Sequence, residues 1–143
     1  MPVLQFESVP QQHVYEQVKP MLEDVFGPVR ERIHAIGYAY EIDGMTVTTT
    51  LSPWADDVVI ANRAYLAGSV PMAEGALREL ARWTEAGRFG TFGVDDADNV
   101  YFEHQLLGST VTTDSLGRSM RAAHAIAVGR RDDFRARFGG GDL

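Results

Sequence analysis

The hydrophobic positions of the chain recur first with the period of a helix. Over residues 11–26 an apolar residue returns every three or four positions, which predicts a helix with one buried face. Pro20 lies inside this helix and lacks a backbone donor, so we expect it to kink or split the helix. Residues 29–35 keep the same spacing after Gly27-Pro28 and predict a further short helical turn.

The period then changes to that of β-strands. Alternating apolar residues predict strands over 38–42, 45–51 and 58–66. The first two are joined by Asp43-Gly44, a dipeptide typical of two-residue hairpin turns. Residues 52–57 read as a turn cluster before the third strand. The middle of the chain is therefore predicted to be an antiparallel meander.

A second helix is predicted over residues 71–86, with Ser69 as a plausible N-cap. Leu77 and Leu80 lie in its apolar stripe, and Trp83 lies on or beside it.

The remaining elements complete the fold prediction. Strands are expected over 89–94 and 100–106, and a last helix begins near Thr112 or Thr113 and runs to the glycines at 139–141. We therefore predict an α+β domain, with an antiparallel sheet of about five strands and helices packed mainly on one face, in the order α-βββ-α-ββ-α. Residues 1–143 form one domain in this prediction, with 1–27 as a helical extension and 139–143 as a flexible tail.

Composition narrows the possible functions. The chain has 143 residues, no cysteine and a net charge of −7, which excludes thiol chemistry and disfavours contact with nucleic acid. No signal segment is visible, and no apolar stretch approaches the ~20 residues of a membrane span. We expect a cytoplasmic protein without membrane contact.

The stretch 87–105, GRFGTFGVDDADNVYFEHQ, carries the most suggestive residues. Its glycines follow a helix and precede a strand, the reverse of the order in a dinucleotide-binding loop. Its aspartates fit neither register of a calcium-binding EF-hand loop, so residues 95–99 read as a hairpin loop. Glu103 and His104 are neighbours on a strand and must face opposite sides, with His104 capping an apolar face through a hydrogen bond.

No catalytic pattern remains after this reading. The chain contains no G-x-S-x-G elbow and no paired histidines at helical spacing. We therefore predict no enzymatic activity, no metal and no cofactor. Trp54 lies in the turn cluster beside two aspartates, where an exposed aromatic suits contact with a partner.

The stretch from Leu77 to Met120 resembles the YbjN family, whose fold is similar to that of type III secretion chaperones. The resemblance covers roughly residues 28–138, with Thr84 where the family commonly has asparagine. It is carried by Arg82-Trp83-Thr84, Arg88-Phe89, the acidic loop Asp95–Asp98, Tyr101-Phe102-Glu103 and Val111-Thr112 followed by Leu116.

The resemblance implies a small, acidic, non-enzymatic protein that is often dimeric and binds another polypeptide or modulates a regulatory pathway. We accordingly expect a protein or peptide partner and a homodimer. The contacts to a partner or to a second copy are expected at Trp54, Leu77, Leu80 and Trp83. The alternative is a regulator that binds a small molecule or metal between helices and sheet, with His104 or His124 involved.

Overall fold

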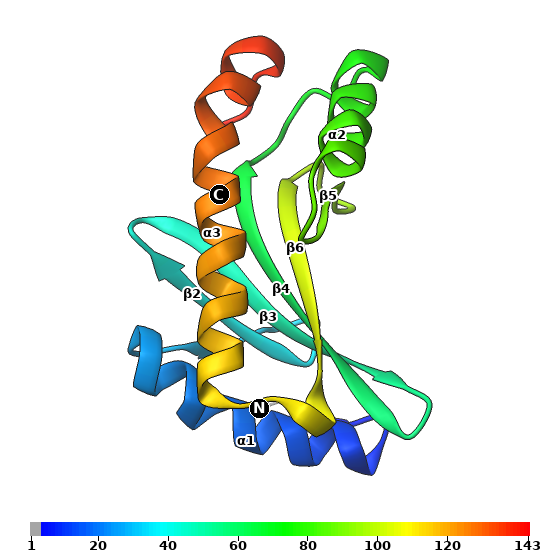
Figure 1. Ribbon diagram of the computed structural model, residues 1–143, viewed down its shortest axis with the longest axis vertical. Coiled ribbons are helices and arrows are strands. Elements are labelled where there is room, and N and C mark those ends of the chain that lie inside the picture. Colours follow the sequence, from blue (N-terminus) through cyan, green and yellow to red (C-terminus); the bar gives the residue numbers. More distant parts are fainter. Residues whose placement is uncertain (1–3) are drawn as a thin grey trace.

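The computed structural model describes residues 4–143, which form one antiparallel sheet with three helices (Figure 1). The sheet has six strands in the order β1-β2-β3-β4-β6-β5. The predicted class and the order α-βββ-α-ββ-α are confirmed, with a two-residue strand added before the meander. The elements are α1 (Val9–Phe26), β1 (Arg30–Glu31), β2 (Gly37–Ile42), β3 (Met45–Trp54), β4 (Asp57–Ala67), α2 (Glu74–Ala86), β5 (Thr91–Val94), β6 (Val100–Leu107), the 3₁₀ turn η1 (Gly108–Thr110) and α3 (Thr113–Phe138).

The helices cover one face of the sheet. In Figure 1, α3 runs along the sheet, α1 crosses its lower end and α2 stands beside β5. Strand residues that point toward the helices are largely buried, because the side chains of each strand alternate between the two faces. These inward residues include Tyr38, Tyr40, Val47, Leu51, Ile60, Ala64, Val100 and Phe102. The opposite face carries no helix and is mostly polar.

Capping fixes the ends of the two long helices. The Ser8 hydroxyl accepts a hydrogen bond from the Gln11 N–H at the start of α1, and Thr112 with Ser115 forms a capping box at the start of α3. Gly27 and Gly139 end these helices with φ of 86°, a conformation that favours glycine. Pro20 does not split α1, because the helix continues through it to Phe26.

The sequence prediction was wrong in three local regions. Residues 29–35 form no helical turn, because Arg30 and Glu31 pair with Ala39 and Tyr38 as strand β1. Residues 52–54 belong to β3, and the turn shrinks to Ala55 and Asp56, with Ala55 at a φ of 52°. Ser69 is not the N-cap of α2, since Ala73 takes that position and Ser69 has a φ of 50°.

The acidic loop has a structural role. The Asp95 carboxylate accepts hydrogen bonds from the N–H groups of Ala97 and Asn99. The Asn99 side chain in turn accepts from the Ser69 N–H, and the Asp98 carbonyl accepts from the Val70 N–H. The loop therefore anchors the connection from β4 to α2, as expected for a hairpin loop that satisfies its own backbone.

The C-terminal glycines lie against the end of β4. Gly141 and Gly68 exchange two backbone hydrogen bonds, of 2.7 and 3.0 Å. The Arg135 side chain pairs with Asp142 of this segment. The flexibility of residues 139–143 stays a prediction, although these contacts define where the segment lies in this structure.

Candidate functional site

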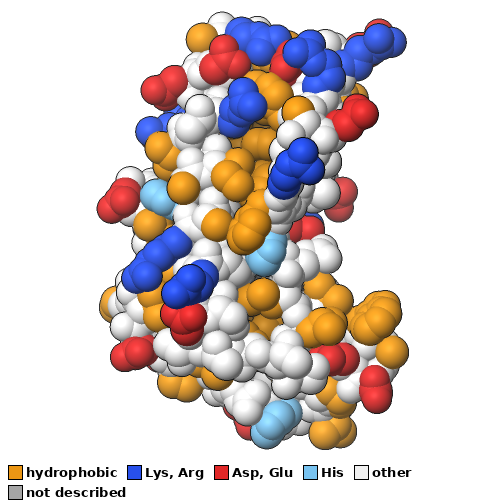
Figure 2. All heavy atoms as spheres, viewed as in Figure 1, with side chains coloured by type: hydrophobic (Ala, Val, Ile, Leu, Met, Phe, Trp, Pro, Cys, Tyr) orange, Lys and Arg blue, Asp and Glu red, His pale blue; other side chains and the backbone are white. Residues whose placement is uncertain are grey.

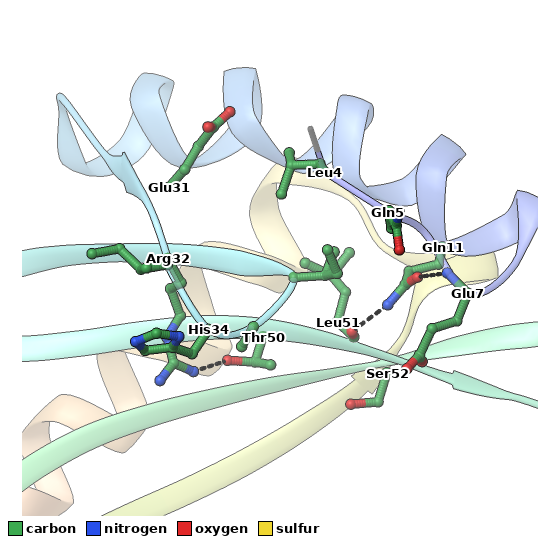
Figure 3. Close-up of a pocket in the computed structure, with 13 residues that line it drawn as sticks. Leu4, Gln5, Glu7, Gln11, Glu31, Arg32, His34, Thr50, Leu51 and Ser52 are labelled. Carbon is green, nitrogen blue, oxygen red and sulfur yellow. Dashed lines mark hydrogen bonds between the residues drawn. The ribbon is translucent and has the colours of Figure 1, made fainter. Parts of the chain in front are cut away.

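A groove of about 600 Å³ lies where α1, the segment before β2 and the end of β3 meet (Figure 3). One wall is the N-terminal segment, residues 4–8, and the other is residues 31–36. The floor is Leu51, which is 2% exposed. Three separate parts of the chain thus form the groove, and no one of them predicts it by itself.

The groove combines apolar walls with charged rims. Leu4, Ile36 and Leu51 supply apolar surface, and Ile33 stands at the mouth with 88% of its surface exposed. Covering an apolar side chain that is this exposed would stabilise a complex, because burial of apolar surface lowers the free energy. Glu7, Glu31, Arg32 and His34 line the rim.

Gln11 joins the N-terminal wall of the groove to its floor. Its side chain is 1% exposed. The Nε2 donates to the Leu51 carbonyl at 3.0 Å, and the Oε1 accepts from the Glu7 N–H at 2.7 Å (Figure 3). On the other side, Arg32 Nη1 donates to Thr50 Oγ1 at 2.7 Å and holds residues 31–36 against β3.

The β3 edge beside the groove is closed to an added strand. Leu51 donates its N–H to the Ile36 carbonyl, and its own carbonyl accepts from Gln11. The next residue that points its backbone to this side is Pro53, which has no N–H. At the opposite edge of the sheet, the Phe92 N–H of β5 donates to Thr84 Oγ1 of α2. At both places the backbone groups are already engaged or, at Pro53, lack a donor, which disfavours the addition of a strand.

A buried chain of hydrogen bonds crosses the core behind the groove. It joins one side chain from each of β2, β3, β4, α3 and β6, namely Tyr40, Thr49, Asn62, Ser119 and His104. The four donor–acceptor distances are 2.8, 2.8, 2.8 and 2.6 Å. His104 thus caps the apolar face through a hydrogen bond, as predicted, while Glu103 lies on the other face and pairs with Arg63.

The proton order in this chain makes His104 a hydrogen-bond acceptor. The Asn62 Oδ1 can only accept, so the Thr49 hydroxyl donates to it and accepts from Tyr40. The Asn62 amide donates to Ser119 Oγ, which leaves the Ser119 proton for Nδ1 of His104. Phe89 stacks on the imidazole at 4.2 Å between ring centroids. These contacts suit a neutral imidazole.

The unfolding free energy should decrease in mild acid because of His104. Burial lowers the pKa of His104 below its ordinary value of 6.5. The unfolded chain therefore takes up the proton first, so this stabilisation is complete above about pH 6.5 and is lost as the pH falls toward the lower pKa of the folded state. Urea unfolding from about pH 7.5 to about pH 5 measures the loss.

His104→Gln provides the comparison for this pH effect, because it removes the titrating group and leaves the other histidines in place. The variant should lose less unfolding free energy than the wild type over the same range. Equal losses in both proteins would show that His104 does not contribute.

The residues predicted to contact a partner fall into two groups. Leu80 and Trp83 are buried, with 3% and 6% exposed, and Trp83 packs on Phe92 and Phe134. Leu77 on α2 is 50% exposed, and Trp54 at the β3–β4 turn is 60% exposed. Of the four, Trp54 and Leu77 are the side chains that a second molecule could reach without opening the core.

Charged side chains hold α2 against α3. The Glu79 side chain is 6% exposed and accepts from Arg137 Nη2 at 2.6 Å. This pairing lowers the pKa of Glu79, chiefly through the hydrogen bond from Arg137. Arg130 of α3 lies over the Trp83 ring. Figure 2 shows that basic side chains, with some acidic ones among them, gather at the upper end of the molecule, where α2 and α3 lie in Figure 1.

The histidines offer no alternative centre. His104 is engaged with Ser119 and Phe89, and the Nε2 of His124 is buried without a hydrogen-bond partner among residues 4–143. In that same part of the chain, no three or more His, Asp or Glu side chains are placed to hold a metal ion. None of the helices described is long and apolar enough to cross a bilayer.

The groove was missed by the sequence reading. Gln11 stands at the start of α1 among polar residues, and Ile33 lies in a stretch interpreted as helical. The alternation Leu4-Gln5-Phe6-Glu7 was the one available signal, because it is typical of an extended segment with one face inward.

Comparison with known proteins identifies a family and a fold. A family model described as "T3SS (YopN, CesT) and YbjN peptide-binding chaperone 1" matches residues 12–143. A structure of the ExsC–ExsE complex is similar with a TM-score of 0.64 and 18% identity, over 85% of this chain and 93% of that chain. The HopA1–SchA chaperone–effector complex gives a TM-score of 0.62 and 13% identity, over 87% and 99%. Both show likeness of fold. No curated protein sequence gives a significant match.

Proposed function

Because the chain belongs to the family of T3SS and YbjN peptide-binding chaperones, we propose that it binds a segment of a partner protein in the groove between residues 4–8 and residues 31–36. The observation that carries this proposal is the exposed Ile33 at the mouth of an apolar groove. We further propose that it acts without catalysis, as a cytoplasmic binding protein. The HopA1–SchA structure, a chaperone–effector complex of similar fold, supports the comparison.

The groove fits a peptide better than a small molecule. It is open to solvent, its apolar lining includes the exposed Ile33, and its rim carries both acidic and basic side chains. Such a surface can cover an amphipathic segment over several residues, with apolar side chains inward and polar groups at the rim. The buried Gln11 fixes the geometry of the floor.

Ile33→Asp should abolish most of this binding. Peptides are selected from a random library against the wild-type protein, and their dissociation constants are then measured by fluorescence anisotropy. The aspartate places a charge on the apolar mouth, so we expect affinity to fall at least about tenfold, equivalent to ~1.4 kcal/mol.

Val128→Asp is the matched control. Val128 is also an exposed aliphatic residue, 39% exposed on α3, and does not line the groove. The Val128→Asp variant should bind the selected peptides with the same affinity as the wild type. Equal affinity of all three proteins would place the peptides elsewhere, and failure to select any peptide would contradict the proposed function.

We also propose that the chain forms a homodimer through α2, with Leu77 in the contact. Leu77 is half-exposed at the edge of the helix face that Leu80 and Trp83 fix to the core. Leu77→Asp should convert a dimer into a monomer in light scattering, because it puts a charge into an apolar contact. A wild-type protein that is monomeric at high concentration would contradict the dimer.

A further inference from the structure

The N-terminal segment before the Ser8 N-cap, residues 4–7, has the form of a bound peptide. Leu4 and Phe6 are half-buried and packed against the core, while Gln5 and Glu7 are exposed. This alternation with period two is that of an extended segment with one face on a surface. The segment precedes α1 and belongs to no strand of the sheet.

Few contacts hold this segment in place. The Glu7 N–H donates to Gln11 Oε1 at 2.7 Å, and within residues 4–143 no other backbone group of residues 4–7 makes a hydrogen bond. Phe6 contributes an edge-on contact with Tyr15 at 5.2 Å between centroids. A segment held by two apolar side chains and one hydrogen bond opens at low free-energy cost.

The surface beneath this segment can receive another chain. Tyr15, on which Phe6 packs, stacks in turn on the buried Tyr38 at 4.7 Å between ring centroids. The Tyr15 hydroxyl is buried without a hydrogen-bond partner among the described residues. Displacement of residues 4–7 would uncover the Tyr15 ring, on which Phe6 packs, and would free Gln11 Oε1 to accept from a new backbone N–H.

We propose that the partner segment is extended, carries apolar side chains two positions apart, and binds by entering the groove and replacing residues 4–7, while Ser8 stays in place as the N-cap of α1. The two apolar side chains take the places of Leu4 and Phe6 against the core, the second of them on the Tyr15 ring. The backbone N–H that follows takes the place of Glu7 on Gln11 Oε1. This inference rests on the proposed function and specifies the partner's pattern and its competition with the chain's own segment.

The probe for this exchange is a fluorescein-labelled synthetic peptide, LQFESV, with the sequence of residues 4–9. In the wild type it competes with residues 4–7 of the same chain, whose effective concentration is high. Phe6→Ser weakens the internal segment without altering the surface beneath it. We expect Phe6→Ser to bind the peptide about tenfold more tightly than the wild type.

Gln5→Ser is the matched control, because Gln5 lies in the same segment but is exposed; its affinity should equal that of the wild type. Adding Gln11→Met to Phe6→Ser should weaken binding about fivefold through loss of one hydrogen bond. Saturating peptide should also accelerate hydrogen exchange at the Glu7 amide of the wild type, since that amide loses its acceptor.

Several outcomes would overturn the replacement. They are equal affinity for wild type and Phe6→Ser, absence of binding to every variant, or dimerisation of Phe6→Ser through the segment of a second copy. A Glu7 amide that stays protected with peptides bound at Ile33 would also overturn it while leaving the proposed function intact. The selection experiment with Ile33→Asp decides the proposed function independently.

Discussion

Thr49→Val is expected to lower the free energy of unfolding by about 2–4 kcal/mol, although it replaces one β-branched side chain by another of the same shape. The Thr49 hydroxyl accepts from Tyr40 and donates to Asn62, and the residue is 0% exposed. The substitution removes two hydrogen bonds and leaves the buried Asn62 Oδ1 without its donor. Lost hydrogen bonds cost about 1 kcal/mol each, and an unsatisfied buried polar atom costs ~1–3 kcal/mol.

Thr48→Val is the control for this effect. Thr48 precedes Thr49 on β3 and is 5% exposed on the opposite face of the sheet. Within the described residues its hydroxyl is buried without a hydrogen-bond partner. Valine lacks this hydroxyl, so the substitution removes a group whose burial destabilises the fold. Thr48→Val should leave stability unchanged or raise it by up to about 1 kcal/mol.

Urea unfolding of both variants at neutral pH measures the difference directly. Strand propensity changes equally in the two, so it cancels from the comparison. Equal effects would show that the hydrogen-bond chain from Tyr40 to His104 does not operate as described. A large difference would identify it as the polar link that holds α3 in register on the sheet, because Ser119 joins the chain from that helix.

Much of the fold follows from local pattern. The Asp43-Gly44 turn, the alternation of β2 to β4 and the stripe of α2 each recur over enough residues to predict their element. The pattern of residues 29–35 did not predict the element that forms there. Seven residues at helical spacing are too few to outweigh the strand pairing of Arg30 and Glu31 with β2. The position of a short edge strand is decided by its neighbour rather than by its own sequence.

The groove could not be predicted for a related reason. It requires residues 4–8, 31–36 and 50–52 to come together, and none of these stretches has a chemical motif. Gln11 becomes important only because the fold brings the Leu51 carbonyl to its side chain. His104 was interpretable in advance, since its position on a strand between Phe102 and Leu106 determines which face it occupies.

The apolar stripe of α2 predicts the helix but does not distinguish its buried positions from its exposed ones. Leu77, Leu80 and Trp83 share an apolar stripe in the sequence, which does not reveal where the core ends and the exposed surface begins. The structure separates them, because α3 and β5 cover Leu80 and Trp83 but leave Leu77 half-exposed. The two leucines, one helical turn apart, therefore provide an internal comparison.

Leu80→Ala is expected to destabilise the fold by about 3 kcal/mol, and Leu77→Ala by less than about 0.5 kcal/mol. Both substitutions remove the same atoms from the same helix, so the change in helix propensity is identical. The difference arises from burial, since Leu80 is 3% exposed and leaves a cavity while Leu77 is 50% exposed. Thermal and urea unfolding measure this difference in unfolding free energy. The protein concentration is kept low enough to dissociate any dimer. Similar losses for the two would mean that Leu77 is buried by a second copy even under these conditions, which would change the role of α2 from a core helix with one exposed leucine to an obligate interface.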